Sequence, residues 1–268
     1  MAIVVAMILV NIATYRELST ATTVLIFLIG TICDMKFIAF GDSFTMGFAT
    51  GLTHDQSKQI SFVNQLQHYT DFTSFENLAV PGSSNSQIAY AVYNWIKNCD
   101  TTDCFVFIGW TTFIRNSSWI NNEYKRSYSP DKFSFFRKIK IENFYLPDSI
   151  QRQIFDTERD ILATGKLLEQ IGVPYSMMQS FDDHTLIKEC VINKTISLPN
   201  WINWSEKNNT MIDICCRRYL TDIDHKDYGK NHKQFDLNSQ YLTPCKHPNE
   251  QGHRLIAQTI YPFLTKNI

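Results

Sequence analysis

The chain has 268 residues, of which 44% are hydrophobic and 19% are charged, and its formal net charge is −1. This length allows one large domain with a full hydrophobic core, and the composition excludes a disordered chain. The near-zero net charge means that the chain as a whole lacks the excess of positive charge typical of nucleic-acid-binding proteins, so no nucleic-acid partner is expected. The seven cysteines include no CxxC pair at metal-ligand spacing, so we expect no zinc site. We expect free thiols, with a Cys99–Cys104 disulfide as the open alternative.

Residues 1–34 contain two apolar runs, 2–13 and 23–33, and both are shorter than the roughly 20 residues that a transmembrane helix needs. Three interpretations stay open. The segment is an extension outside the fold, with translation starting at Met35, or a signal or membrane anchor, or a part of the fold. The first interpretation predicts a soluble, cytoplasmic protein, and the second a secreted or membrane-anchored one. A membrane partner is expected only if this segment is a genuine anchor.

From residue 35 onwards, short apolar segments alternate with segments of helical periodicity. Strands are predicted at 36–40, 74–80, 103–110 and 173–180, and helices at 59–69, 86–98, 151–171 and 250–264. This alternation predicts βαβ units and a central parallel sheet, which is an α/β fold. The polar and aromatic segments 113–150 and 182–245 interrupt the alternation. We interpret them as insertions in a single domain that spans 35–268.

Small residues stand at the ends of three predicted strands. Ser43, Gly82 and Gly109 are expected to lie close together, because sites in parallel sheets form at the carboxyl ends of the strands. A serine there is a nucleophile only if a histidine lies within hydrogen-bond reach. The G-x-S-x-G elbow of the α/β-hydrolases is absent, because Thr45 occupies the position of its second glycine.

Four blocks, in chain order, resemble those of the SGNH or GDSL hydrolase family: FGDSFTMG at 40–47, NLAVPGSSN at 77–85, FIGW at 107–110 and HPNEQGHRLIA at 247–257. The resemblance covers roughly 36–110 and 151–264. It implies a three-layer α/β/α fold similar to flavodoxin and a serine esterase or acylhydrolase without cofactor. It also implies Ser43 as the nucleophile, His247 as the general base, and the backbone N–H groups of Ser43 and Gly82 as oxyanion donors. The implied partner is an acylated small molecule or glycan, and carbohydrate deacetylation is one such reaction.

The chain departs from the family at two positions. Thr111 stands where the third block has an asparagine that donates to the oxyanion, and its hydroxyl is expected to take that role. Pro244 stands where the family has the aspartate that orients the histidine. Either a carboxylate from elsewhere, such as Asp236, Asp224 or Asp222, or a backbone carbonyl takes its place, and we favour the carbonyl. The alternative function is a catalytically decayed module on the same fold, which binds carbohydrate or is structural.

Several further residues are expected to be structural. Asp42 is expected to order its turn by accepting backbone hydrogen bonds, and His253 to cap or pack a helix. Trp110, Trp201 and Trp204 are expected to pack in the core or at the rim of the fold, and not to stack on a sugar.

Overall fold

The computed structural model describes residues 35–49, 51–112, 115, 117–120, 123–126, 147–180, 200–202, 210–216 and 239–264. Residues 1–34 and much of both predicted insertions lie outside this part of the chain. The expectations for residues 1–34, and for Trp204 in the second insertion, therefore stay predictions. In the described part, no helix is both long and apolar enough to span a membrane.

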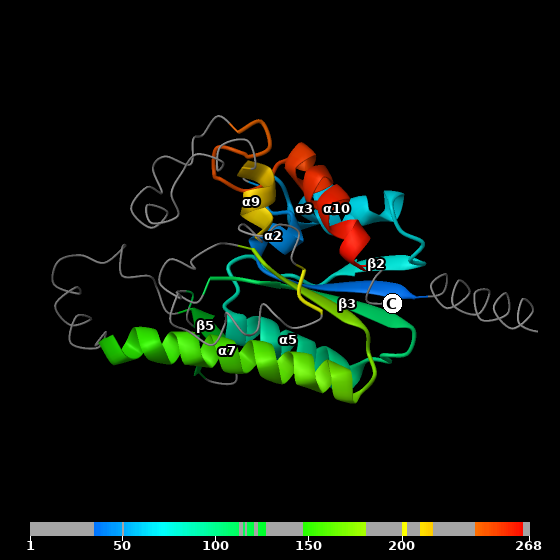
Figure 1. Cartoon of the computed structure of the whole chain (residues 1–268). Coiled ribbons are helices and arrows are strands. Elements are labelled where there is room, and N and C mark those ends of the chain that lie inside the picture. The colour runs from blue at the N-terminus through cyan, green and yellow to red at the C-terminus, as the bar shows by residue number, and fades with distance from the viewer. Residues whose placement is uncertain are drawn as a thin grey trace, which may run out of the picture.

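Four parallel strands form the central sheet, in the order β2-β1-β3-β6 (Figure 1). They are β1 (Lys36–Gly41), β2 (Ser74–Asn77), β3 (Cys104–Trp110) and β6 (Tyr175–Gln179). The register places Lys36 beside Ser74 on one side and beside Cys104 on the other. The four predicted strands are therefore confirmed, although β2 ends at Asn77 and not at residue 80. Beyond Asn77 the chain still follows β1, since Leu78 N–H donates to the Ala39 carbonyl.

Helices cover both faces of the sheet, which confirms the three-layer α/β/α fold (Figure 1). On one face lie α5 (Asn85–Asn98) and α7 (Pro147–Gln170), and on the other lie α2 (Ser43–Met46), α3 (His54–Ile60), α4 (Phe62–Gln65), α9 (Met211–Cys216) and α10 (Glu250–Leu264). Successive strand residues point to opposite faces. Phe37 and Ala39 enter the core beneath α4 and α10, while Ile38 and Phe40 enter the core beneath α5 and α7.

The prediction of one continuous helix at 59–69 is wrong. The chain there forms three short helical pieces, which are the end of α3, then α4 and the 3-10 helix η1 (Leu66–His68). Ser61 causes the break. Its backbone is extended, with φ −60° and ψ 152°, so it ends α3 and caps α4, where its hydroxyl accepts from Asn64 N–H. The helix predicted at 151–171 starts earlier, at Pro147, and Gly172 follows it at φ 72°, which suits glycine.

The first predicted insertion contains two paired antiparallel strands that the sequence pattern did not reveal, β4 (Ser117–Ile120) and β5 (Glu123–Arg126). Cys99 and Cys104 are free thiols, so the alternative of a disulfide between them is excluded. Trp110 is fully buried and Trp201 nearly so, as expected for packing residues.

Candidate active site

Ser43 is the first residue of α2 and follows the turn that ends β1. The carboxylate of Asp42 caps this helix by accepting from Phe44 N–H at 3.0 Å, which confirms the expected role of Asp42 in ordering the turn. Gly47 ends α2 in the left-handed conformation, with φ 87°. The cap and the glycine confine the helix to one turn, so the position of Ser43 is fixed at the carboxyl end of β1.

Two glycines allow α2 to lie directly on the sheet. A Cβ atom added to Gly41 or to Gly109 would overlap the hydroxyl of Thr45 in α2. Asn77, at the end of β2, donates from its side-chain amide to the Thr45 carbonyl at 2.8 Å and holds the helix from the side. Gly41, Gly109 and Asn77, all within the quoted blocks, therefore position the helix that carries Ser43.

The structure brings Ser43 and His247 together, although 204 positions separate them in the chain. The distance from His247 Nε2 to Ser43 Oγ is 2.9 Å, and Nδ1 lies 3.1 Å from the Cys245 carbonyl oxygen. A carbonyl can only accept, so Nδ1 carries the hydrogen in the neutral ring, and Nε2 is left to accept from the serine hydroxyl. The rings of Phe44 and Phe48 contact the imidazole, with centroid distances of 5.5 and 5.2 Å.

The acceptor at His247 Nδ1 is thus a backbone carbonyl within the part of the chain that the structure describes. Asp236, Asp224 and Asp222, the carboxylates considered for this position, lie outside the described residues. Pro244 belongs to the turn that carries the Cys245 carbonyl, since Lys246 N–H donates to the Thr243 carbonyl at 2.9 Å across it.

The two backbone N–H groups predicted as oxyanion donors make no hydrogen bond to any acceptor among the described residues. Ser43 N–H is at the start of a helix, where no intrahelical partner exists. Gly82 has φ 73°, a conformation that is unfavourable for residues with a side chain. Their role in binding an oxyanion stays a prediction.

Thr111 does not fit the role expected of it. Its side chain is fully buried, and its hydroxyl donates its only hydrogen to Asp42 Oδ2 at 2.8 Å. Its backbone is bonded as well, because Thr111 N–H donates to Asn85 Oδ1 at 2.9 Å and the Asn85 amide donates to the Thr111 carbonyl at 3.1 Å. With its hydrogen directed to Asp42, Thr111 is not kept as an oxyanion donor.

Asp42 accepts from more than its own turn. Besides Phe44 N–H and Thr111, it accepts from the hydroxyl of Ser180 at 3.0 Å and from the Arg115 guanidinium at 3.1 Å. This carboxylate therefore links the chain that follows β1 to the chain that follows β3 and β6. These interactions of Asp42 were not expected from the sequence. The position of Ser180 just after β6 was the available signal, whereas no pattern marked Arg115.

His253 lies in α10 with both ring nitrogens buried and without a hydrogen-bond partner among the described residues. Its ring stacks on Phe62 at a centroid distance of 6.4 Å, so it is a packing residue, as predicted. Burial, together with a smaller effect of the nearby His247, lowers the pKa of His253 from 6.5 to about 3. His253 is therefore neutral at physiological pH.

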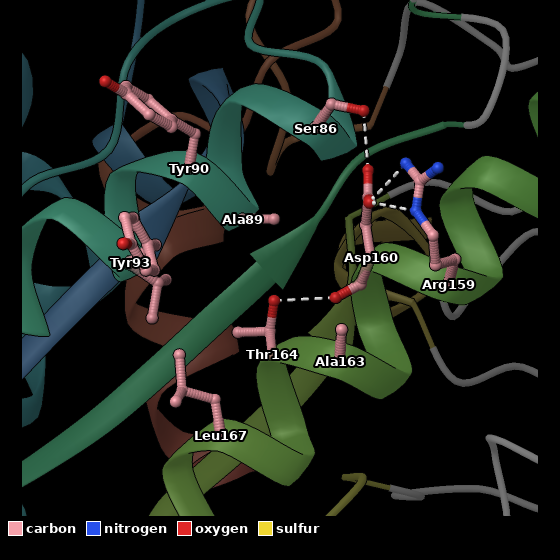
Figure 2. Close-up of a pocket in the computed structure, with 10 residues that line it drawn as sticks. Ser86, Ala89, Tyr90, Tyr93, Arg159, Asp160, Ala163, Thr164 and Leu167 are labelled. Atoms are coloured by element: carbon pink, nitrogen blue, oxygen red, sulfur yellow. Dashed lines mark hydrogen bonds and ion pairs between the residues drawn. The ribbon is translucent and has the colours of Figure 1, made fainter.

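A hollow with a volume of about 340 Å³ lies between α5 and α7 (Figure 2). At one end Asp160 accepts from the Ser86 hydroxyl at 2.6 Å and from Arg159 at 2.8 Å. Neither Ser43 nor His247 lines it. Within the described ranges, no three His, Cys, Asp or Glu side chains gather to hold a metal ion.

Comparisons with known proteins return no matching family model and no matching curated protein. Several solved structures are similar. A protein assigned to the lipolytic G-D-S-L family, from Desulfitobacterium hafniense DCB-2, has a TM-score of 0.47 and 12% identity, covering 85% of this chain and 99% of its own. A member of the lipolytic G-D-S-L family from Veillonella parvula DSM 2008 has a TM-score of 0.39 and 13% identity, covering 84% of this chain and 96% of its own. TesA has a TM-score of 0.42 and 9% identity, covering 87% of this chain and 100% of its own. These TM-scores and identities are too low to indicate a function. The function is therefore inferred from the geometry of Ser43 and His247 and from the sequence blocks.

Proposed function

We propose that this chain is a serine esterase of the SGNH type that cleaves small acyl esters. The observation that carries the proposal is the pair formed by Ser43 and His247, with Oγ and Nε2 2.9 Å apart. Serine becomes nucleophilic only when a base takes its proton, and the tautomer set by the Cys245 carbonyl leaves Nε2 able to do so.

The reaction proceeds through an acyl-enzyme. Ser43 Oγ attacks the acyl carbon while His247 Nε2 takes the hydroxyl proton, and the carbonyl oxygen becomes an oxyanion that receives the N–H groups of Ser43 and Gly82. Collapse breaks the ester bond, and the leaving alcohol takes the proton from His247. Water then attacks the acyl-enzyme with His247 as base, which releases the carboxylic acid and restores Ser43.

The narrower proposal is that the substrate is an O-acetylated carbohydrate. Its support is the family resemblance of the sequence blocks. A substrate series tests it: p-nitrophenyl acetate, butyrate and octanoate for the acyl group, and an O-acetylated sugar for the alcohol. A kcat/KM that falls from acetate to octanoate, with acetate released from the sugar, is the expected result. A preference for octanoate would contradict it.

The competing function is a catalytically decayed module that binds carbohydrate. It is favoured by the loss of two family groups, because Thr111 donates to Asp42 and a carbonyl replaces the aspartate at His247. A fluorophosphonate probe separates the two functions, since it reacts only with an activated serine. Labelling of Ser43 at neutral pH supports the esterase. No labelling, together with glycan binding, supports the module.

Replacement of Ser43 and His247 by alanine tests the proposed ester hydrolysis. Ser43→Ala and His247→Ala should each lower kcat/KM for p-nitrophenyl acetate by about 10³-fold or more. The double variant should be no worse than either single one, because the two side chains act as a unit. Ser57→Ala, at a buried serine, and His68→Ala, at an exposed histidine, are the matched controls. Equal activity in wild type and both variants would exclude the proposal.

A further inference from the structure

The residues just before α10 form a tight hairpin loop. Lys246 N–H donates to the Thr243 carbonyl at 2.9 Å, and Thr243 N–H donates to the His247 carbonyl at 2.8 Å. Leu242 and Pro248 form an antiparallel bridge on either side. This is the hydrogen-bond pattern of a three-residue hairpin loop, whose third loop residue takes the left-handed conformation. Lys246 occupies that position with φ 65°.

Three residues fix the shape of this loop. Pro244 stands at the second position of the turn, where its restricted φ is favourable. Thr243 clamps His247 with its hydroxyl, which donates to the His247 carbonyl at 2.9 Å and accepts from His247 N–H at 3.3 Å. Lys246 adopts a conformation that is uncommon for a residue with a side chain. Together they hold the Cys245 carbonyl 3.1 Å from His247 Nδ1.

We propose that the turn at Thr243–Lys246 is the positioning element for His247 and performs the orienting role of the missing aspartate; this inference rests on the proposed function. The carbonyl of Cys245 fixes the tautomer and the direction of the ring, and it brings no charge that titrates. Thr243, Pro244 and Lys246 act through this carbonyl, so they are positioning residues. Pro244, which stands where the family has the aspartate, is thus part of the turn that orients His247 in its place.

Two substitutions of Lys246 test the turn, since both remove the same charge. Glycine adopts a positive φ freely, whereas β-branched valine strongly disfavours it. We expect Lys246→Gly to retain most of the wild-type kcat. Lys246→Val should lower kcat by about 10²-fold with little change in KM, because displacement of the imidazole by about 1 Å is enough for such a loss.

The nitrogen NMR spectrum of the His247 ring distinguishes positioning from mere stability. Wild type and Lys246→Gly should show one tautomer with hydrogen on Nδ1, and Lys246→Val a mixture of both. Should Lys246→Val fail to fold, Thr243→Val and Thr243→Ser replace the pair, because only serine keeps the hydroxyl that clamps His247. Equal kcat and equal tautomer in folded members of a pair would overturn the inference.

The proposed function and the turn can fail separately. If wild type shows the single Nδ1–H tautomer that Lys246→Val loses, but neither hydrolyses p-nitrophenyl acetate nor reacts with a fluorophosphonate, the esterase assignment fails and the turn still positions the ring. If wild type is an active esterase whose ring shows both tautomers, the turn inference fails alone.

Discussion

Asp42 is a fully buried carboxylate next to the nucleophile, and such a group is costly unless it is paired and hydrogen-bonded. Its four donors satisfy it, and one of them, the Arg115 guanidinium, offsets its charge. That balance matters for the proposed reaction, because an uncompensated negative charge beside Ser43 would oppose formation of the oxyanion. Thr111 stands where the resemblance implies an oxyanion donor, but its hydroxyl donates to the Asp42 carboxylate instead.

Removal of the Arg115 side chain should lower both stability and activity. We expect Arg115→Ala to lower the free energy of unfolding by about 1–3 kcal/mol, below the range for a fully buried pair because the arginine is 30% exposed, and to lower kcat. In the double variant Arg115→Ala/Asp42→Asn the buried charge is absent, so part of the loss should return. Urea unfolding and p-nitrophenyl acetate kinetics measure both effects.

The exposed ion pair of Arg254 and Glu250 in α10, 3.8 Å apart, supplies the control for this cycle. Arg254→Ala should change the free energy of unfolding by less than about 0.5 kcal/mol. If the losses in Arg115→Ala and Asp42→Asn simply add in the double variant, the two side chains are not coupled and the electrostatic account of Asp42 is wrong.

Helix α2 has only four residues, so it has little stability of its own, and its place depends on its contacts with the sheet. It lies against β1 and β3 because Gly41 and Gly109 present no side chains to Thr45. The Thr45 hydroxyl is buried without a hydrogen-bond partner in the described structure, which is the cost of this close approach. Ser43 is accurately placed only while this contact persists.

Gly109→Ala should therefore displace α2. We expect a loss of about 1–3 kcal/mol in the free energy of unfolding, typical of overpacking, together with a lower kcat. Adding Thr45→Ala removes the hydroxyl that the new Cβ would overlap, so the double variant should regain most of both. Thr45→Ala alone is the control and should be nearly neutral in stability. A double variant no better than Gly109→Ala would show that Thr45 is not the obstacle.

Over the whole molecule, the features that could be predicted from the sequence are those that depend on local patterns of residues. The strands and the pair of Ser43 and His247 follow from apolar runs and ordered blocks, and the topology of a parallel sheet brings strand ends together. The bonding of Thr111 to Asp42 could not be predicted, because it depends on side-chain directions at the ends of two strands. The Cys245 carbonyl could not be predicted either, since every residue carries one. Ser61 broke a helix whose periodicity was otherwise continuous.

The buried ring of His253 makes the stability of the whole fold depend on pH. Its pKa is about 3 in the folded chain against 6.5 for an ordinary histidine, so protonation favours the unfolded chain. The contribution of the neutral ring is fully present above pH 6.5 and is lost as the pH falls from 6.5 towards 3. Between pH 7.5 and pH 5 this amounts to roughly 2 kcal/mol of the free energy of unfolding.

His253→Phe keeps an aromatic ring beside Phe62 and removes the titration. Urea unfolding between pH 5 and pH 7.5 should therefore show a smaller loss of stability on acidification in this variant than in wild type, by roughly 2 kcal/mol. Carboxylates titrate in both proteins, so the difference between the two curves isolates His253. Parallel curves for wild type and His253→Phe would mean that His253 gains a proton as readily in the folded chain as in the unfolded one.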